Sequence, residues 1–165
     1  MTKPVVIGLG NELFGDDGFG PRLARRLGSL IAETADVVEC RSVGLALLDP
    51  LVGRPRAVIL DAICTGRNKP GTILRLTPAD LRCLSNLSPH YVGLPEVLRT
   101  ARRLELPVPS EILIIAVEAG DVSTIGAGLS PEVEAVEEEV IAEVVATINR
   151  WQQQNGLKRP ANQHV

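Results

Sequence analysis

The sequence places two adjacent carboxylates, Asp16 and Asp17, after a short apolar run and a glycine turn in the stretch VVIGLGNELFGDDGFG. Such a turn often cradles phosphate, but two negative charges repel phosphate and attract a cation. A third carboxylate, Asp61, follows the apolar run RAVIL, and His90 lies in the loop SNLSPHYVG. Two carboxylates and one imidazole form an incomplete shell that suits nickel or zinc better than magnesium or calcium, and it leaves positions open for water or substrate.

Each of these residues also has a simpler interpretation. Asp16 caps the helix that begins after it, and Asp17 is then a solvated acid of the first helical turn. Asp61 satisfies amide groups of its loop, and His90 is a hydrogen-bonded loop residue. The simple interpretation explains Asp16 well, but it explains Asp17 poorly once Asp61 and His90 are considered together with it.

The elements that position these residues alternate between strands and helices. Apolar runs predict strands, and amphipathic spacing with caps predicts helices. The predicted strands are 4–8, 36–42, 56–60, 72–76 and 111–117, and the predicted helices are 19–31, 45–51, 95–104 and 131–151, the last with Ser130 as N-cap. This alternation predicts an α/β fold: a three-layer αβα domain, residues 1–151, with about five strands in a mostly parallel twisted sheet and helices on both faces.

The orientation of one strand, the state of the C-terminal residues and the place of the active site are the further points of this prediction. The turn at 66–71 makes a mixed sheet the alternative, with one strand antiparallel, and the polar residues 152–165 are predicted to be a disordered tail. In sheets of this kind the active site lies at the carboxyl ends of the strands. We therefore expect Asp17, Asp61 and His90 at one edge of the sheet.

Composition excludes several classes of function. The chain of 165 residues has a net charge of −3 and only 2% aromatic residues, which argues against a nucleic-acid partner. The sequence shows no secretory signal and no apolar run of about 18 residues. We therefore expect neither a membrane span nor a membrane partner. The three cysteines, Cys40, Cys64 and Cys83, are widely spaced and are expected to be reduced thiols in the cytoplasm.

Three stretches follow one another in the chain as a set: GLGNELFGDDGFG, then VILDA at 58–62, then SPHYVGL at 88–94. In order and spacing they resemble the nickel–iron hydrogenase maturation endopeptidases. The first is similar to the family pattern G-x-G-N-x-L-x-x-D-D/E-G-x-G, the second to its acidic site at a strand end, and the third to S-x-H-x-x-G/P-L. The resemblance extends from Val5 to about Ile148.

This resemblance implies a hydrolase, an aspartic-type, metal-recognising endopeptidase that removes a short C-terminal extension from the hydrogenase large subunit after nickel insertion. It implies that Asp17, Asp61 and His90 both contact the metal and serve catalysis. Nickel is expected to come with the partner, the large-subunit precursor, and to bind the free protein weakly. An activated water would attack the peptide carbonyl, with either the metal as Lewis acid or a carboxylate as general base.

Two other functions are weighed against this one. A non-proteolytic nickel-binding maturation chaperone would use the same three ligands, and the sequence separates it poorly from the protease. Peptidyl-tRNA hydrolases also begin with a strand and a GLGN turn, but they need a histidine soon after it and a basic surface; residues 11–30 contain no histidine. The roles of Asp16, Glu12, Glu118 and Asp121 stay open at this point.

Overall fold

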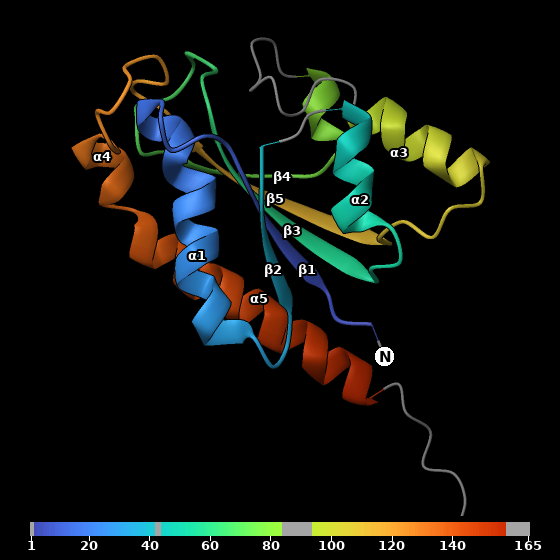
Figure 1. Ribbon diagram of the computed structural model, residues 1–165. Helices are drawn as coiled ribbons and strands as arrows, with labels where there is room; N and C mark the ends of the chain where they lie inside the picture. The colour runs from blue at the N-terminus through green and yellow to red at the C-terminus, as the bar shows by residue number, and fades with distance from the viewer. Residues whose placement is uncertain (1, 42–43, 84–93, 158–165) are drawn as a thin grey trace, which may run out of the picture.

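Five strands form one sheet in the order β2-β1-β3-β5-β4 in the computed structural model, which describes residues 2–41, 44–83 and 94–157 (Figure 1). The strands are β1 (Val5–Leu9), β2 (Asp36–Cys40), β3 (Arg56–Ile63), β4 (Ile73–Leu76) and β5 (Glu111–Glu118). The first, second, third and fifth run parallel, and β4 pairs antiparallel with β5 at the edge. The predicted α/β fold is confirmed, in the mixed form of its sheet.

Helices cover both faces of this sheet, as Figure 1 shows. On one face lie α1 (Phe19–Ile31), α4 (Pro131–Glu134) and α5 (Glu137–Leu157), and on the other lie α2 (Leu48–Leu51) and α3 (Leu94–Arg103). Three short 3-10 helices complete the described elements: η1 (Gly15–Gly18), η2 (Gly44–Leu47) and η3 (Asp80–Cys83). No helix within the described ranges has the length and hydrophobicity needed to cross a membrane.

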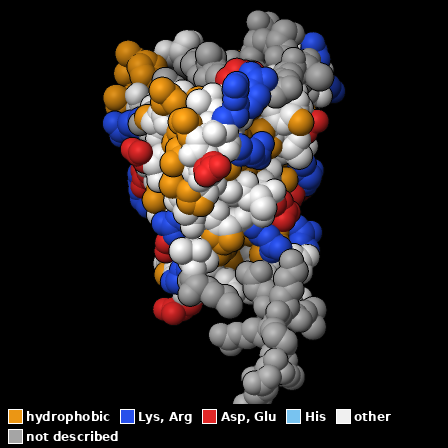
Figure 2. Space-filling view, turned by 90° about the vertical axis from the view of Figure 1, so that its right-hand side faces the viewer, with side chains coloured by type: hydrophobic (Ala, Val, Ile, Leu, Met, Phe, Trp, Pro, Cys, Tyr) orange, Lys and Arg blue, Asp and Glu red, His pale blue; other side chains and the backbone are white. Residues whose placement is uncertain are grey.

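The core is divided by the sheet because successive strand side chains point to opposite faces. Val6 of β1 packs in the cluster of α1 and α5, whereas Val5 and Ile7 pack in the cluster of α2 and α3. All three are fully buried. The exposed positions of α3 are polar or charged, among them Glu96, Arg99 and Arg102, and Figure 2 shows charged side chains interspersed with hydrophobic ones on this side of the molecule.

The N-terminus of α1 lies unusually close to the sheet because Gly20 has no side chain. A Cβ atom built on Gly20 would lie 2.2 Å from the carbonyl oxygen of Leu9 and 2.4 Å from that of Leu60. Only glycine allows this approach. The glycines of the first motif therefore bring the segment that carries Asp17 down onto β1 and β3, rather than forming a phosphate cradle.

Several boundaries differ from those predicted. Strand β3 continues to Ile63, so Asp61 lies inside the strand and not after it. The last helix is divided into α4 and α5, and α5 reaches Leu157, so residues 152–157 are helical rather than part of a disordered tail. Gln152 Nε2 donates a hydrogen bond of 2.8 Å to the Thr34 carbonyl, which holds this end of the helix to the turn that follows α1. The rest of the predicted tail, 158–165, lies outside the described residues.

Candidate active site

The sheet has its topological switch point at β1. The chain leaves β1 for β2 on one side and later enters β3 on the other, and both neighbours run parallel to β1. Ligands of open α/β sheets bind at the carboxyl ends of the strands beside such a point. Asp17 lies in η1, immediately beyond β1, and Asp61 lies near the end of β3.

Asp17 is fixed by its own loop. The Asn11 backbone N–H donates both to Asp17 Oδ2, at 2.7 Å, and to the Asp17 carbonyl oxygen, at 3.1 Å. Gly10, with φ +132°, closes this loop, since a Cβ there would lie 1.9 Å from the Asp17 carbonyl oxygen. The side chain of Asp17 is partly exposed. This carboxylate is thus held in place and still accessible to a substrate.

Asp61 is fully buried, and its backbone is paired with Ala116 of β5. The Ala62 N–H donates a hydrogen bond of 2.8 Å to Asp61 Oδ1. The approach of Gly20 to the Leu60 carbonyl places the start of α1 directly beside Asp61, and η1 with Asp17 leads straight into that helix. The structure therefore brings these two predicted site residues to one edge of the sheet.

His90, the third predicted site residue, lies outside the described residues. Within the described ranges, no three His, Cys, Asp or Glu side chains come together as a group able to hold a metal ion. The proposed ligand set of Asp17, Asp61 and His90 thus remains a prediction.

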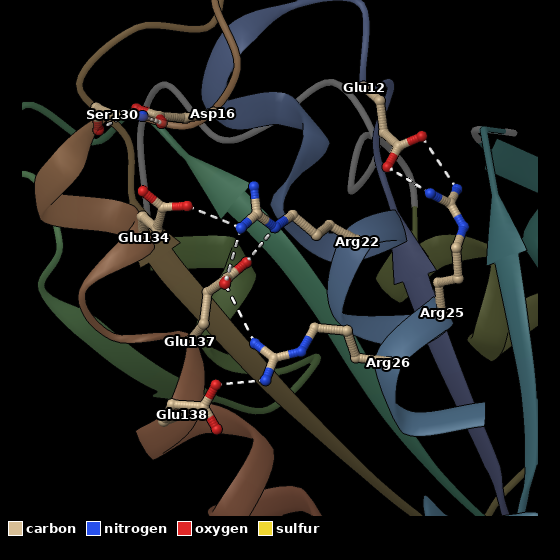
Figure 3. A network of polar contacts seen from close by, with 9 residues as sticks. All are labelled: Glu12, Asp16, Arg22, Arg25, Arg26, Ser130, Glu134, Glu137 and Glu138. Carbon is tan, nitrogen blue, oxygen red and sulfur yellow. Dashed lines mark hydrogen bonds and ion pairs between the residues drawn. The ribbon is translucent and has the colours of Figure 1, made fainter. Parts of the chain in front are cut away.

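Asp16 does not cap the helix that follows it, so that interpretation is wrong. Its fully buried carboxylate accepts hydrogen bonds from the backbone N–H groups of Gly120, Asp121 and Ser130, at 2.7, 3.0 and 2.6 Å. The Ser130 hydroxyl, predicted to cap the last helix, donates to Asp16 Oδ2 at 3.0 Å instead (Figure 3). Asp16 therefore joins the loop after β1 to the segment after β5.

Glu118 performs a similar task at the end of β5. It is 2% exposed and accepts hydrogen bonds from the Thr65 N–H at 2.7 Å, the Thr65 hydroxyl at 2.6 Å and the Gly66 N–H at 2.9 Å. The loop after β3 is consequently fixed to β5. No signal in the sequence distinguishes this structural glutamate from a catalytic one, because its partners lie more than 50 residues earlier in the chain.

The other two acids left open by the sequence also have local roles. Glu12 forms an ion pair with Arg25 of α1, at 3.0 Å (Figure 3), and Arg25 also pairs with Glu39. Asp121 accepts hydrogen bonds within its own turn, and those from Thr124 and then Ser123 lower the pKa of the Asp121 carboxyl. Both side chains stabilise loops at the carboxyl edge.

The pKa of Cys64 reflects the negative charge at this edge, although the sequence alone assigned Cys64 no role there. Partial burial raises the pKa of the Cys64 thiol although the residue is exposed overall, and Glu118, Asp16, Asp17 and Asp121 raise it further through their negative charges. Thiols are nucleophilic as thiolates, so a raised pKa argues against Cys64 as a nucleophile at neutral pH. The same four carboxylates make the edge attractive to a cation and repellent to phosphate.

Cavities lie near both ends of the parallel strands in the described part of the molecule. A cavity of about 130 Å³ lies beside η1, and its lining residues are Glu12, Gly15, Gly18, Arg22, Gly128 and Leu129. A larger one, of about 330 Å³, lies at the opposite edge of the sheet near the start of β5, and its lining includes Thr77, Arg102 and Glu111. Neither Asp17 nor Asp61 lines either cavity, although Gly15 and Gly18 of η1 line the smaller one, so cavity size does not locate the candidate site.

Comparison with known proteins identifies the family. The family model described as hydrogenase maturation protease matches residues 21–147, more than half of the chain. The chain belongs to the hydrogenase maturation protease family. The resemblance seen in the three motifs is thereby confirmed, and a role as a protease in hydrogenase maturation follows.

Individual relatives agree with this assignment. The hydrogenase 2 maturation protease of Escherichia coli is 29% identical over 148 residues, which cover 87% of this chain and 89% of that protein. The solved structure of the hydrogenase maturating endopeptidase HybD from Escherichia coli superposes with a TM-score of 0.78, at 28% identity over 90% of this chain and 93% of that chain. The NiFe hydrogenase maturation protease HybD from Thermococcus kodakarensis gives a TM-score of 0.69 at 25% identity, covering 89% and 99% of the two chains.

Proposed function

We propose that this hydrogenase maturation protease removes the C-terminal extension of a nickel–iron hydrogenase large subunit after nickel insertion, and that Asp17, Asp61 and His90 recognise the bound nickel. The observation that supports this proposal most is the pair of carboxylates at the switch point. Asp17 lies beyond β1 and Asp61 near the end of the adjacent strand β3, at an edge whose charge favours a cation.

In this proposal nickel belongs to the substrate. Two carboxylates and one imidazole leave a coordination shell incomplete, and the ligands of the precursor supply the rest. The free protein then binds nickel weakly. A precursor without nickel lacks the group that these three residues recognise, so it is not cut.

Recognition of the metal places the scissile peptide bond at the same edge. A water molecule attacks the peptide carbonyl, and a carboxylate of the site accepts its proton as general base, in the manner of an aspartic-type protease. Polarisation of the carbonyl by nickel as a Lewis acid is the alternative route. We place the reaction in the cytoplasm, since Cys40 and Cys64 are free thiols.

Cleavage of a nickel-loaded large-subunit precursor by single-site variants tests this proposal. His90→Ala, Asp17→Asn and Asp61→Asn should each lower the cleavage rate by about 10- to 100-fold or more, because each removes one of three contacts with the metal. Combining two of them should add little further loss if the three act as one unit. A thermal melt of each variant separates lost recognition from lost folding, which matters most for the buried Asp61.

Glu12→Gln is the matched control for these variants. It changes an acid in the same loop, but one whose partner is Arg25 on the surface of α1, so cleavage should continue at the wild-type rate. A folded His90→Ala protein that still cuts nickel-loaded precursor at the wild-type rate would remove His90 from the site. Retention of nickel by the wild-type protein without cleavage of the precursor would favour the chaperone instead.

A further inference from the structure

Asp16 is buried where a carboxylate is costly unless all of its oxygens are satisfied. Its hydrogen-bond donors are the backbone N–H groups of Gly120, Asp121 and Ser130 and the hydroxyl of Ser130. All four partners are donors, and a carboxylate is the side chain that accepts all four. These partners belong to the segment 120–130, which connects β5 to α4.

The backbone of η1 is attached to the same segment. The Asp16 N–H donates to the Asp121 carbonyl at 2.7 Å, and the Gly126 N–H donates to the Leu13 carbonyl at 2.9 Å. Gly15, with φ +48°, lies so close that a Cβ there would be 2.5 Å from the Asp121 carbonyl oxygen. Leu13, Gly15 and Asp16 are thus held against a segment more than 100 residues later in the chain.

The far end of that segment is fixed as well. Ser130 lies at the N-cap position of α4, and Arg22 of α1 pairs with Glu134 of α4 at 2.8 Å and with Glu137 of α5 at 2.8 Å (Figure 3). The helices that follow the segment are therefore joined to α1 by ion pairs, and the segment itself is joined to η1 by Asp16. These contacts hold the turn that carries Asp17 against the segment.

Asp17 is the next residue in the same 3-10 turn. Because such a helix has about three residues per turn, neighbouring side chains point about 120° apart. The buried Asp16 side chain points toward segment 120–130, and Asp17, whose oxygen is bonded to the Asn11 N–H, remains partly exposed. Fixing the Asp16 side chain consequently fixes the direction of Asp17.

We infer that Asp16 is a positioning residue for Asp17: its buried hydrogen bonds to segment 120–130 aim the Asp17 carboxylate at the nickel-loaded precursor. This inference rests on the proposed function of Asp17. It assigns to the first acid of the pair a task distinct from that of the second, without contact between Asp16 and the substrate.

The test compares Asp16→Asn, Ser130→Ala and Asp17→Asn in cleavage of a nickel-loaded large-subunit precursor, with kcat and KM measured separately and a thermal melt for each. Asp16→Asn turns one acceptor oxygen into a donor that faces another donor, so it should lower kcat/KM by about 10- to 100-fold while the protein remains folded at the assay temperature. Ser130→Ala removes only the hydroxyl bond and should give a smaller loss in the same direction. In the double variant Asp16→Asn/Asp17→Asn, the loss should equal that of Asp17→Asn alone.

Arg26→Ala is the control for stability. It breaks ion pairs between α1 and the side chains of Glu137 and Glu138 in α5. The packing of α1 on α5 is thereby weakened, while the contacts of η1 stay unchanged. At an assay temperature below all the melting transitions it should cleave at the wild-type rate. If the loss in Asp16→Asn were only a loss of stability, Arg26→Ala with a similar melting temperature would lose cleavage equally, and the inference would fail.

The outcomes separate this inference from the proposed function. Asp17→Asn at the wild-type rate would refute the role of Asp17 itself. An inactive Asp17→Asn beside a fully active Asp16→Asn would refute the positioning role alone. Should Asp16→Asn not fold, Ser130→Ala decides, since a wild-type kcat/KM in that variant would overturn the inference.

Discussion

Gly20 offers the most direct physical test of how the site is assembled. A Cβ at this position would lie 2.2 Å from the Leu9 carbonyl oxygen and 2.4 Å from the Leu60 carbonyl oxygen, where ordinary contact begins at 3.4 Å. Both obstacles are backbone atoms of adjacent strands, so Gly20→Ala forces α1 outward by about 1 Å or distorts the sheet. The same shift moves η1, and with it Asp17, away from Asp61.

The size of the effect follows from two opposing terms. Overpacking costs about 1–3 kcal/mol, and rigid backbone neighbours place this site at the upper end. Alanine regains at most about 1 kcal/mol of helix propensity. The net loss of unfolding free energy is therefore about 2 kcal/mol, which lowers Tm by about 4–8 °C in a chain of this size.

Gly28, in the same helix, is the matched control because a Cβ there meets nothing within 4 Å. Gly28→Ala should stabilise the protein by about 0.5–1 kcal/mol, since only the helix-propensity term remains. Thermal and urea unfolding followed by far-UV circular dichroism measure both variants, and a precursor-cleavage assay below Tm measures the displacement of Asp17. A Gly20→Ala protein as stable and active as Gly28→Ala would refute the close packing of α1 on the sheet.

Two further predictions concern the carboxyl edge and the C-terminus. Asp17→Asn should lower the pKa of Cys64 toward its ordinary value and so speed alkylation of this exposed thiol by iodoacetamide at pH 8, as measured by mass spectrometry. The control Glu12→Gln should leave the alkylation rate unchanged. An unchanged rate in Asp17→Asn would contradict the proximity of Asp17 and Cys64. Truncation after Leu157 should leave Tm and cleavage unchanged. Truncation after Trp151 removes the last part of α5 and the hydrogen bond from Gln152 to Thr34. This shorter protein should lose about 1 kcal/mol of unfolding free energy, measured by urea unfolding. Equal stability of the two truncated proteins would show that the end of α5 contributes nothing.

Local sequence signals predicted most elements of the fold. The helix expected at 19–31 corresponds residue for residue to α1, because its apolar spacing and preceding turn are local features. The strands were found from apolar runs, and the turn at 66–71 indicated the antiparallel strand β4. Boundaries failed where distant pairing decides them: β3 continues to Ile63 because its last residues pair with the end of β5.

The site was predictable in its residue types but not in its supporting contacts. Asp17 and Asp61 were singled out by their predicted places after buried strands, and the fold brings both to one edge. The role of Asp16 was not readable, because its partners are 104 to 114 residues away and two of the three contribute only backbone groups to it. His90 lies outside the described residues, so its part in the site stays a prediction.

The central claim is that this protein recognises nickel in the precursor before it cuts. Its most direct test is parallel incubation of the wild-type protein with the same large-subunit precursor prepared with and without nickel, followed by mass measurement of the large subunit. The proposal predicts loss of the C-terminal extension only from the nickel-loaded precursor, and no cleavage in its nickel-free counterpart. Equal cleavage of both preparations would contradict it, because Asp17, Asp61 and His90 would then have no metal to recognise.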